Sequence, residues 1–168
     1  MFLVYGGDKE LVVNGYVYTS FDTDPNDSKS QTRYVFILNG GAVSWCSSKQ
    51  SVVVGSTCEV DYIAASEATN EGVWMKEFIS DLGVIPRASG PMKIFCDNTG
   101  AIALAKESRR TKHIKGRFNS IRDQVKEGDI VICKIHTDLN VADPLTKPLS
   151  RAKHDQHQDY MGVRIITM

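Results

Sequence analysis

The spacing of apolar residues changes near residue 56, and this change restricts the folds that the chain can adopt. Before it, residues 11–21 are rich in Val and Tyr and alternate as in a strand, and an Asn-Gly-Gly turn at 39–41 joins two apolar runs as in a β-hairpin. After it, apolar residues recur every three or four positions up to Gly83. With Ser56 or Thr57 as its cap, this segment predicts an amphipathic helix of about 25 residues.

The rest of the chain predicts alternating strands and helices. Residues 51–54 are β-branched and are expected to add an antiparallel strand. Beyond the long helix, elements are predicted in the order strand, helix, helix, strand and helix, at 92–96, 100–106, 113–126, 130–135 and 141–145. We expect the residues after 150 to form a weakly ordered tail. A strand meander followed by such crossovers implies a mixed sheet with helices on its faces.

The composition fits a single domain but hides an uneven charge. The chain has 168 residues, of which 42% are hydrophobic, so it can bury a core. Its 20 basic and 20 acidic side chains cancel, which argues against a strongly basic nucleic-acid binder. However, residues 1–105 hold 7 basic and 12 acidic side chains, whereas residues 106–168 hold 13 and 8. This asymmetry indicates an anionic partner for the second part.

Several classes of protein are excluded by what the sequence lacks. No apolar run reaches the roughly 18–20 residues that span a bilayer, so we expect no membrane partner. The first residues lack the basic region of a signal peptide. The cysteines form no Cys-x-x-Cys motif and are interpreted as reduced thiols of an intracellular protein, either cytoplasmic or nuclear. They are Cys46, Cys58, Cys96 and Cys133.

Three carboxylates occupy positions where such a fold can present chemistry. Asp97 follows a predicted strand, Asp143 begins a predicted helix, and Asp61 lies in the first turns of the long helix. Carboxylates from different elements can hold Mg²⁺, and two such ions can cleave a phosphodiester. Each Asp also has a simpler interpretation, because an acidic residue at a helix start commonly caps the helix or interacts with its dipole.

Six segments carry a specific combination of motifs. They are Ser-Lys-Ser-Gln-Thr-Arg-Tyr-Val-Phe (28–36), Gly-Gly-Ala-Val-Ser-Trp-Cys-Ser-Ser-Lys-Gln (40–50), Ser-Thr-Cys-Glu-Val-Asp-Tyr-Ile-Ala-Ala-Ser-Glu-Ala (56–68), Phe-Cys-Asp-Asn-Thr-Gly-Ala-Ile-Ala-Leu-Ala-Lys (95–106), Thr-Lys-His-Ile (111–114) and Val-Ala-Asp-Pro-Leu-Thr-Lys-Pro-Leu (141–149). In this order, they closely resemble the ribonuclease H domain at the end of copia-type retrotransposon Pol polyproteins. The resemblance covers residues 11–150. Residues 1–10 resemble the end of a reverse-transcriptase connection, and residues 151–168 form a C-terminal tail similar to that of such polyproteins.

This resemblance implies a fold and an activity. The fold is an α/β ribonuclease H-like fold, with a five-stranded mixed sheet of three antiparallel and then two parallel strands, flanked by helices. The activity is hydrolysis of the RNA strand of an RNA–DNA hybrid, assisted by two Mg²⁺ (or Mn²⁺) ions that four acidic side chains hold. A reverse-transcriptase domain of the same polyprotein is implied as a further partner.

Carried over one position at a time, the resemblance assigns metal binding and catalysis to Asp97 and Asp143. The second acidic position falls on Asp61, where the family has Glu, and the first falls on Tyr18, where the family has Asp. Asp61 keeps the charge but is shorter by roughly 1.5 Å. A phenol with a pKa of about 10 is neutral at pH 7 and is a poor ligand for Mg²⁺. We therefore predict that catalysis is impaired in this chain.

Residues 106–126 carry eight basic side chains, opposed only by Glu107 and Asp123. A concentrated cationic face gains affinity for nucleic acid by releasing counterions, and its phosphate contacts depend on shape more than on sequence. The alternative is a solvated helix face, which is the usual role of a charge run. The residues predicted to contact nucleic acid are Arg109, Arg110, Lys112, Lys115 and Arg117.

His136 is a further catalytic candidate, because it precedes Asp143 in a loop where ribonucleases H often place a mobile histidine. There it could assist proton transfer or product release, and the alternative is an ordinary surface histidine. His154 and His157 could hold a metal only with additional ligands, which the sequence does not offer.

Three hypotheses are compatible with these patterns. The first is a ribonuclease H with residual, metal-dependent activity. The second is a pseudoenzyme of the same fold that binds nucleic acid without cleaving it. The third is a structural relic that once packed against a reverse transcriptase.

Overall fold

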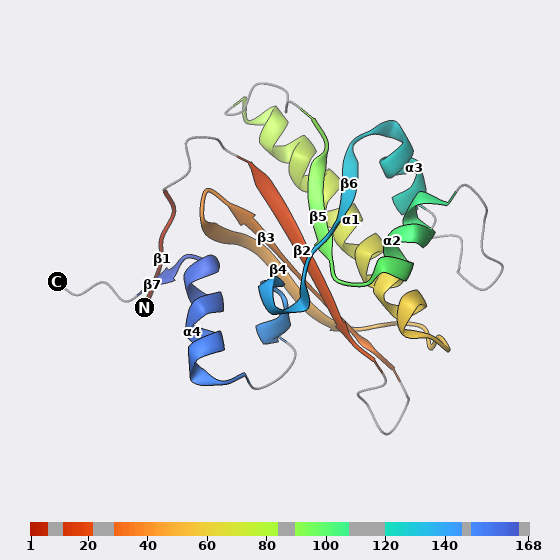
Figure 1. Cartoon of the computed structure of the whole chain (residues 1–168). Helices are drawn as coiled ribbons and strands as arrows, with labels where there is room; N and C mark the ends of the chain where they lie inside the picture. Colours follow the sequence, from red (N-terminus) through yellow and green to blue (C-terminus); the bar gives the residue numbers. More distant parts are fainter. Residues whose placement is uncertain (7–11, 22–28, 84–89, 108–119, 146–148, 165–168) are drawn as a thin grey trace.

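A computed structural model describes residues 1–6, 12–21, 29–83, 90–107, 120–145 and 149–164 of the chain. Its centre is a five-stranded sheet with the strand order β4-β3-β2-β5-β6 (Figure 1). The strands are β2 (Val13–Ser20), β3 (Gln31–Leu38), β4 (Gly41–Lys49), β5 (Met92–Cys96) and β6 (Ile130–Lys134). The predicted mixed sheet is confirmed, because β2, β3 and β4 pair antiparallel whereas β5 pairs parallel with both β2 and β6.

The predicted hairpin between β3 and β4 is confirmed. Asn39 and Gly40 have φ angles of 51° and 76°, the left-handed conformation that a tight hairpin turn requires. The prediction of a strand at 51–54 is wrong, because β4 continues to Lys49 and the chain then leaves the sheet. Buried Gln50 makes this exit: its backbone N–H donates to Ser30 O at 2.8 Å, and its amide donates to the backbone of α1. The apolar residues that follow pack on the core instead of pairing.

The predicted long helix is α1 (Thr57–Asp81). Ser56 caps it by accepting a hydrogen bond from the backbone N–H of Glu59, and Gly83 follows its end with a φ of 65°. The helix predicted at 100–106 is α2 (Thr99–Lys106), and Asn98 caps it. The helix predicted at 113–126 corresponds to α3 (Ser120–Glu127), and residues 113–119 lie outside the described part of the chain.

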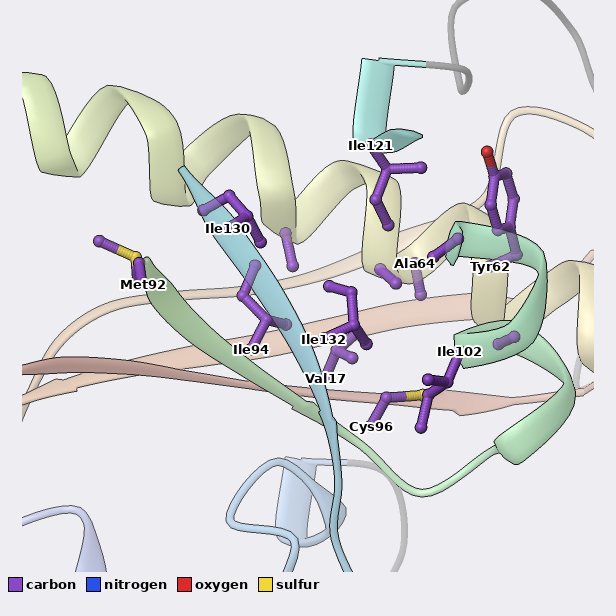
Figure 2. Close-up of a cluster of buried hydrophobic side chains, with 14 of the residues drawn as sticks. Val17, Tyr62, Ala64, Met92, Ile94, Cys96, Ile102, Ile121, Ile130 and Ile132 are labelled. Carbon is purple, nitrogen blue, oxygen red and sulfur yellow. The ribbon is translucent and has the colours of Figure 1, made fainter. Parts of the chain in front are cut away.

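The two faces of the sheet are covered unequally. The helical face, which presents Val17, Phe36, Ile94 and Ile132, packs against α1, α2 and α3 in one continuous core (Figure 2). Among the described residues, the open face, which presents Tyr16, Tyr18, Val35 and Trp45, carries only a small buried cluster. That cluster consists of Val35, Ala42, Val141 and Ala142, with Tyr18 and Met161 packed at its edge.

The expectation of a weakly ordered tail after residue 150 is wrong. Residues there form α4 (Arg151–Tyr160) and β7 (Val163–Arg164), and β7 pairs antiparallel with β1 (Phe2–Leu3), so the two ends of the described chain lie side by side (Figure 1). No apolar periodicity predicts α4, because His157 is its only buried residue. The predicted helix at 141–145 is a single 3₁₀ turn, η3 (Asp143–Leu145), preceded by η2 (Thr137–Leu139). Among the described helices, none could cross a membrane.

Candidate metal and nucleic-acid site

A pocket of about 320 Å³ lies where β2 ends and where α1 and α2 begin. Two of the three predicted carboxylates, Asp61 and Asp97, line it together. The position after a strand and before a helix is where α/β folds commonly place functional groups, because several chain ends converge there. The remaining lining residues are Tyr18, Thr19, Phe21, Thr57, Asn98 and Thr99.

Asp61 is a buried carboxylate whose two oxygens are both hydrogen-bonded by the protein. The hydroxyl of Thr19, on β2, donates to Oδ1, and the amide of Asn98 donates to Oδ2 at 2.8 Å. The orientation of the Asn98 amide is fixed from its other end, because its Oδ1 accepts the backbone N–H groups of Gly100 and Ala101 at the start of α2. Asp61 therefore joins α1 to both β2 and α2.

The ionisation of Asp61 reflects this environment. Burial raises the pKa of Asp61, because the charged form loses its water. The hydrogen bonds from Thr19 and Asn98 oppose this rise in pKa, and the nearby charges of Asp97 and Lys134 add smaller effects of opposite sign. The carboxylate thus depends on its neutral hydrogen-bond donors more than on a counter-ion for its stabilisation.

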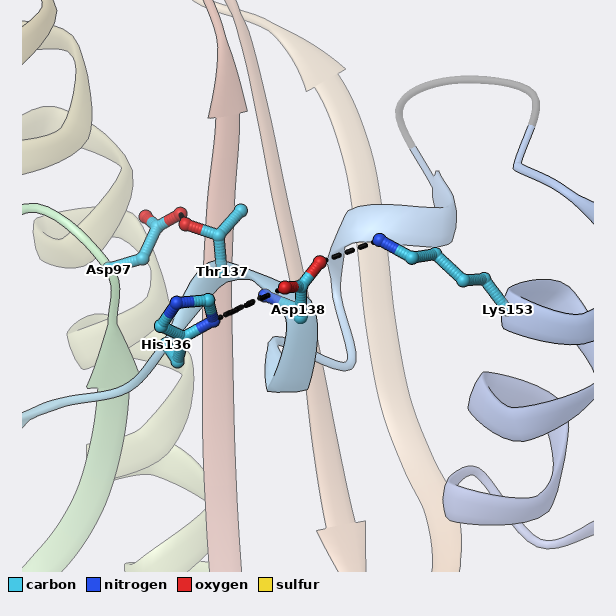
Figure 3. Close-up of polar contacts among 5 residues, drawn as sticks. All are labelled: Asp97, His136, Thr137, Asp138 and Lys153. Atoms are coloured by element: carbon cyan, nitrogen blue, oxygen red, sulfur yellow. Dashed lines mark hydrogen bonds and ion pairs between the residues drawn. The ribbon is translucent and has the colours of Figure 1, made fainter.

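Asp97 is tied to the loop that follows β6. Its Oδ2 accepts a hydrogen bond from the Thr137 hydroxyl at 2.9 Å (Figure 3). Its backbone carbonyl accepts a hydrogen bond from Lys134. The catalytic candidate His136 lies in the same loop, and Nδ1 of its exposed ring is 3.5 Å from Asp138 Oδ2 (Figure 3). Lys153 of α4 in turn donates to Asp138 at 2.6 Å. The loop with the histidine is therefore connected both to the pocket and to the C-terminal helix.

Asp143, the third predicted carboxylate, does not line this pocket. It is buried at the start of η3, and its backbone N–H donates to Asn140 O at 3.0 Å. Asn140 is itself anchored to β2, because its amide donates to Val17 O at 2.8 Å. The structure brings Asp61 and Asp97 together and places Asp143 beside the buried cluster of the open face.

Tyr18 belongs partly to the pocket and partly to the packing of the open face. Its ring packs against the cluster around Val35 and Val141 while it also lines the pocket. Directly across the strand pair, Arg33 is the Cα partner of Tyr18 and is buried. Arg33 is not among the predicted site residues, because a single Arg beside an apolar run usually occupies an exposed polar position.

The residues present do not fit the two-ion site that the resemblance implies. Both oxygens of Asp61 already accept hydrogen bonds, Tyr18 offers a neutral phenol, and Asp143 does not line the pocket. In the described part of the chain, no three His, Cys, Asp or Glu side chains are grouped so that they could hold a metal ion. Mg²⁺ requires several oxygen ligands in a strict geometry, which this arrangement does not offer.

The predicted nucleic-acid contacts Arg109, Arg110, Lys112, Lys115 and Arg117 all lie outside the described residues. Arg122, from the same basic run, is directed into the protein. Its Nε donates to Leu104 O at 3.0 Å, and its guanidinium lies 5.4 Å from the ring centre of Tyr62. This arginine stabilises the packing of α3 and is not available as a phosphate contact.

Comparison with known proteins identifies the family. No protein-family model matches the chain. The chain is 37% identical, over 96% of its length, to the retrovirus-related Pol polyprotein from transposon TNT 1-94 of Nicotiana tabacum. It is 33% identical, over 91% of its length, to that from transposon RE1 of Arabidopsis thaliana. The chain is a ribonuclease H-like domain related to copia-type Pol polyproteins.

This ribonuclease H-like domain corresponds to a small part of its relatives, spanning 12% of the tobacco polyprotein and 10% of the Arabidopsis one. Solved structures agree with the fold. LC11-RNase H1, isolated from compost by a metagenomic approach, matches with a TM-score of 0.55 and 14% identity, covering 81% of this chain and 93% of that protein. The same enzyme in complex with an RNA/DNA hybrid matches with a TM-score of 0.51 and 14% identity. This match covers 79% of this chain and 92% of that protein.

Proposed function

We propose that this domain binds RNA–DNA hybrids in the manner of a ribonuclease H and cleaves their RNA strand weakly or not at all. The observation that carries the proposal is a ribonuclease H-like fold in which Tyr18 occupies the position where the family resemblance expects a metal-binding Asp. The hybrid-bound structure of LC11-RNase H1, which shares this fold, supports the choice of nucleic acid. The basic residues at 109, 110, 112, 115 and 117 would contact its phosphates.

The proposal has further parts that concern the whole protein. Residues 11–150 form the ribonuclease H-like unit, residues 1–10 are the end of a reverse-transcriptase connection, and residues 151–168 are a C-terminal extension. A reverse-transcriptase domain of the same polyprotein is the second partner, and the protein acts inside the cell, in the cytoplasm or nucleus. Any residual cleavage by this chain would use Asp61, Asp97, Asp143 and His136 as catalytic residues and Mg²⁺ or Mn²⁺ as cofactor.

The impairment is tested by cleavage of a labelled RNA–DNA hybrid in Mg²⁺ and in Mn²⁺. The native chain is compared with the double variant Tyr18→Asp, Asp61→Glu. A matched control, Tyr18→Asn with Asp61→Glu, has nearly the same shape but no carboxylate at position 18. We expect cleavage near background for the native chain and the control, and a gain of at least about tenfold for the double variant, which corresponds to about 1.4 kcal/mol of barrier. Cleavage by the native chain at the rate of the double variant would show that the site is not impaired.

Binding is tested separately from cleavage. The native chain should bind a hybrid duplex with an affinity that falls as salt rises, because phosphate contacts release counterions. The variant Arg109→Gln, Arg110→Gln should bind more weakly and with a shallower salt dependence. The alternative function, a structural relic of a polyprotein, predicts no salt-sensitive binding of the hybrid by either protein.

A further inference from the structure

Arg33 is a buried cation directly across from Tyr18, and neither the metal-site assignment nor the predicted nucleic-acid contacts account for it. Its Nε donates to the Ser47 hydroxyl at 3.0 Å, one Nη donates to the Ser20 hydroxyl at 3.3 Å, and the other donates to Gln31. Among the described residues, these hydrogen-bond partners are all neutral. Burial lowers the pKa of Arg33, yet a guanidinium keeps its charge in proteins. The open face therefore holds a desolvated positive charge with neutral partners.

The position of Arg33 determines what a carboxylate at position 18 would meet. Arg33 on β3 and Tyr18 on β2 are paired residues of antiparallel strands, so their side chains leave the same face. Cβ atoms of such a pair lie about 4.5–5.5 Å apart. An arginine and a carboxylate on such paired residues can form strong, often bidentate, hydrogen bonds. A carboxylate returned to position 18 would thus face the guanidinium as well as the pocket.

The other carboxylates of the pocket are already held by the protein. Thr19 and Asn98 each donate to one oxygen of Asp61, and Thr137 donates to Asp97. A divalent cation would have to displace these donors at the pocket while meeting the repulsion of a fixed positive charge on the neighbouring strand. In a partly buried setting, such repulsion is only weakly screened by salt.

From this arrangement, we infer that Arg33 is the resident cation opposite position 18, and that it weakens the binding of divalent ions at this site when a carboxylate is restored at position 18. This inference deepens the proposed loss of the metal site, but it concerns ion binding alone and does not depend on recognition of a hybrid. It assigns to Arg33 a role in setting the charge of the site. In the variant Tyr18→Asp, Asp61→Glu, Arg33 therefore lowers the affinity of the site for divalent ions.

The test is a double-mutant cycle on the whole chain, with Mn²⁺ as the probe and its electron paramagnetic resonance signal as the readout, in the absence of nucleic acid. The two backgrounds are the native chain and the variant Tyr18→Asp, Asp61→Glu. In each background, Arg33→Gln removes the charge and keeps a hydrogen-bonding amide. We expect Arg33→Gln to increase Mn²⁺ affinity at least about tenfold in the second background and to leave the native background unchanged. Lys93→Gln, an equal change of charge at an exposed position on β5, serves as the control and should have no effect in either background.

The outcomes separate this inference from the proposed function. Equal Mn²⁺ affinity with and without Arg33→Gln in the Tyr18→Asp, Asp61→Glu background overturns the inference, as does an equal gain in both backgrounds. Neither result bears on hybrid binding or on cleavage by the native chain, which are measured separately. If Arg33→Gln weakens folding, urea unfolding of the same four proteins without metal supplies a second measurement. The inference then requires Arg33→Gln to cost more stability when position 18 carries a carboxylate, and it is overturned by equal losses.

Discussion

The helical face and the open face of the sheet use similar strands for different purposes. On the helical face, fully buried residues such as Val17, Ile94 and Ile130 form one core with three helices (Figure 2). On the open face, four buried residues form the cluster, and an apolar pocket of about 290 Å³ remains beside it, with Trp45 62% exposed at its rim. The first face specifies the fold, whereas the second tolerates residues such as Tyr18 and Arg33 that change the chemistry.

This contrast means that a ribonuclease H-like fold can keep its core while residues at the pocket on the open face vary. A substitution on the helical face leaves a cavity in a close-packed interior, which is costly. At the edge of the open face, Tyr18 stands where the resemblance expects an Asp, and its ring packs against the cluster, so packing favours it. A phenol at this position offers no carboxylate to the pocket that it lines. Stability and chemistry are therefore separable along the single strand β2.

The largest predicted effect compares the same substitution on the two faces. Ile94→Ala removes a fully buried side chain from the helical face and should lower the free energy of unfolding by about 3–5 kcal/mol. Ile37→Ala, at a half-buried position packed on the open-face cluster, should lower it by about 1–2 kcal/mol. Urea unfolding with an unchanged m-value measures both. Equal losses would mean that the open face contributes as much to stability as the helical face.

The next effect concerns the hydrogen bonds that join the pocket to the helical face. Asn98→Ala removes the cap of α2 and one donor to Asp61, and should cost about 2–3 kcal/mol. Asn98→Asp is the matched variant, since it keeps the cap acceptor but turns a carboxylate toward Asp61. Repulsion between two carboxylates raises their pKa values in the folded state. A raised folded pKa gives stability that is present at low pH and lost as the pH rises through that pKa.

Unfolding measured at pH 4 and pH 7 checks that the side chain at position 98 faces Asp61. Asn98→Asp should lose more stability at pH 7 than at pH 4, relative to the native chain, whereas Asn98→Ala should show a smaller difference between the two pH values. If both variants change equally with pH, the Asn98 side chain does not face Asp61 closely enough for their charges to interact.

The sequence predicted the helical face well because its signals are local. Alternation predicted β2, the Asn-Gly turn predicted the β3–β4 hairpin, and apolar periodicity with a Ser cap predicted α1. A strand was expected at 51–54 because β-branched residues favour strands. The prediction is wrong because the hydrogen bonds of the Gln50 side chain and backbone direct the chain out of the sheet at this point. Those bonds reach residues that are distant in sequence and leave no local pattern.

The site was harder to predict than the fold. The placement of Asp61 and Asp97 at one pocket followed from strand ends and helix starts. The donors that hold them, Thr19 and Thr137, carry no signal of their own in the sequence. Arg33 could have been found only from the register between β2 and β3, which places it opposite position 18. The helix α4 could not, because it has almost no apolar periodicity.

A smaller effect is expected for the short β1–β7 ribbon that borders the open-face pocket. Phe2 lines this pocket and remains 53% exposed, so Phe2→Ala should lower the free energy of unfolding by less than about 1 kcal/mol. Hydrogen exchange should show that the amide of Val4, which donates to Gly162 O at 2.8 Å, exchanges faster in this variant. Unchanged exchange at Val4 would indicate that the ribbon is held by its backbone bonds alone.

The smallest effect is expected for the ion pair between Lys153 and Asp138, which links α4 to the loop of His136 (Figure 3). Hydrogen bonding by Lys153 lowers the pKa of Asp138, so the pair contributes above the ordinary pKa of that carboxyl and is lost as the pH falls through the lowered value. Because both side chains are exposed, Lys153→Met should leave stability nearly unchanged at pH 7 while raising the pKa of Asp138 in an NMR titration. Arg151→Met, which removes the pairing with Asp155 one turn away, is the control and should leave the pKa of Asp138 unchanged. A clear loss of stability in Lys153→Met would mean that this face of α4 supports the fold, and the contrast between the two faces would then be weaker than the packing suggests.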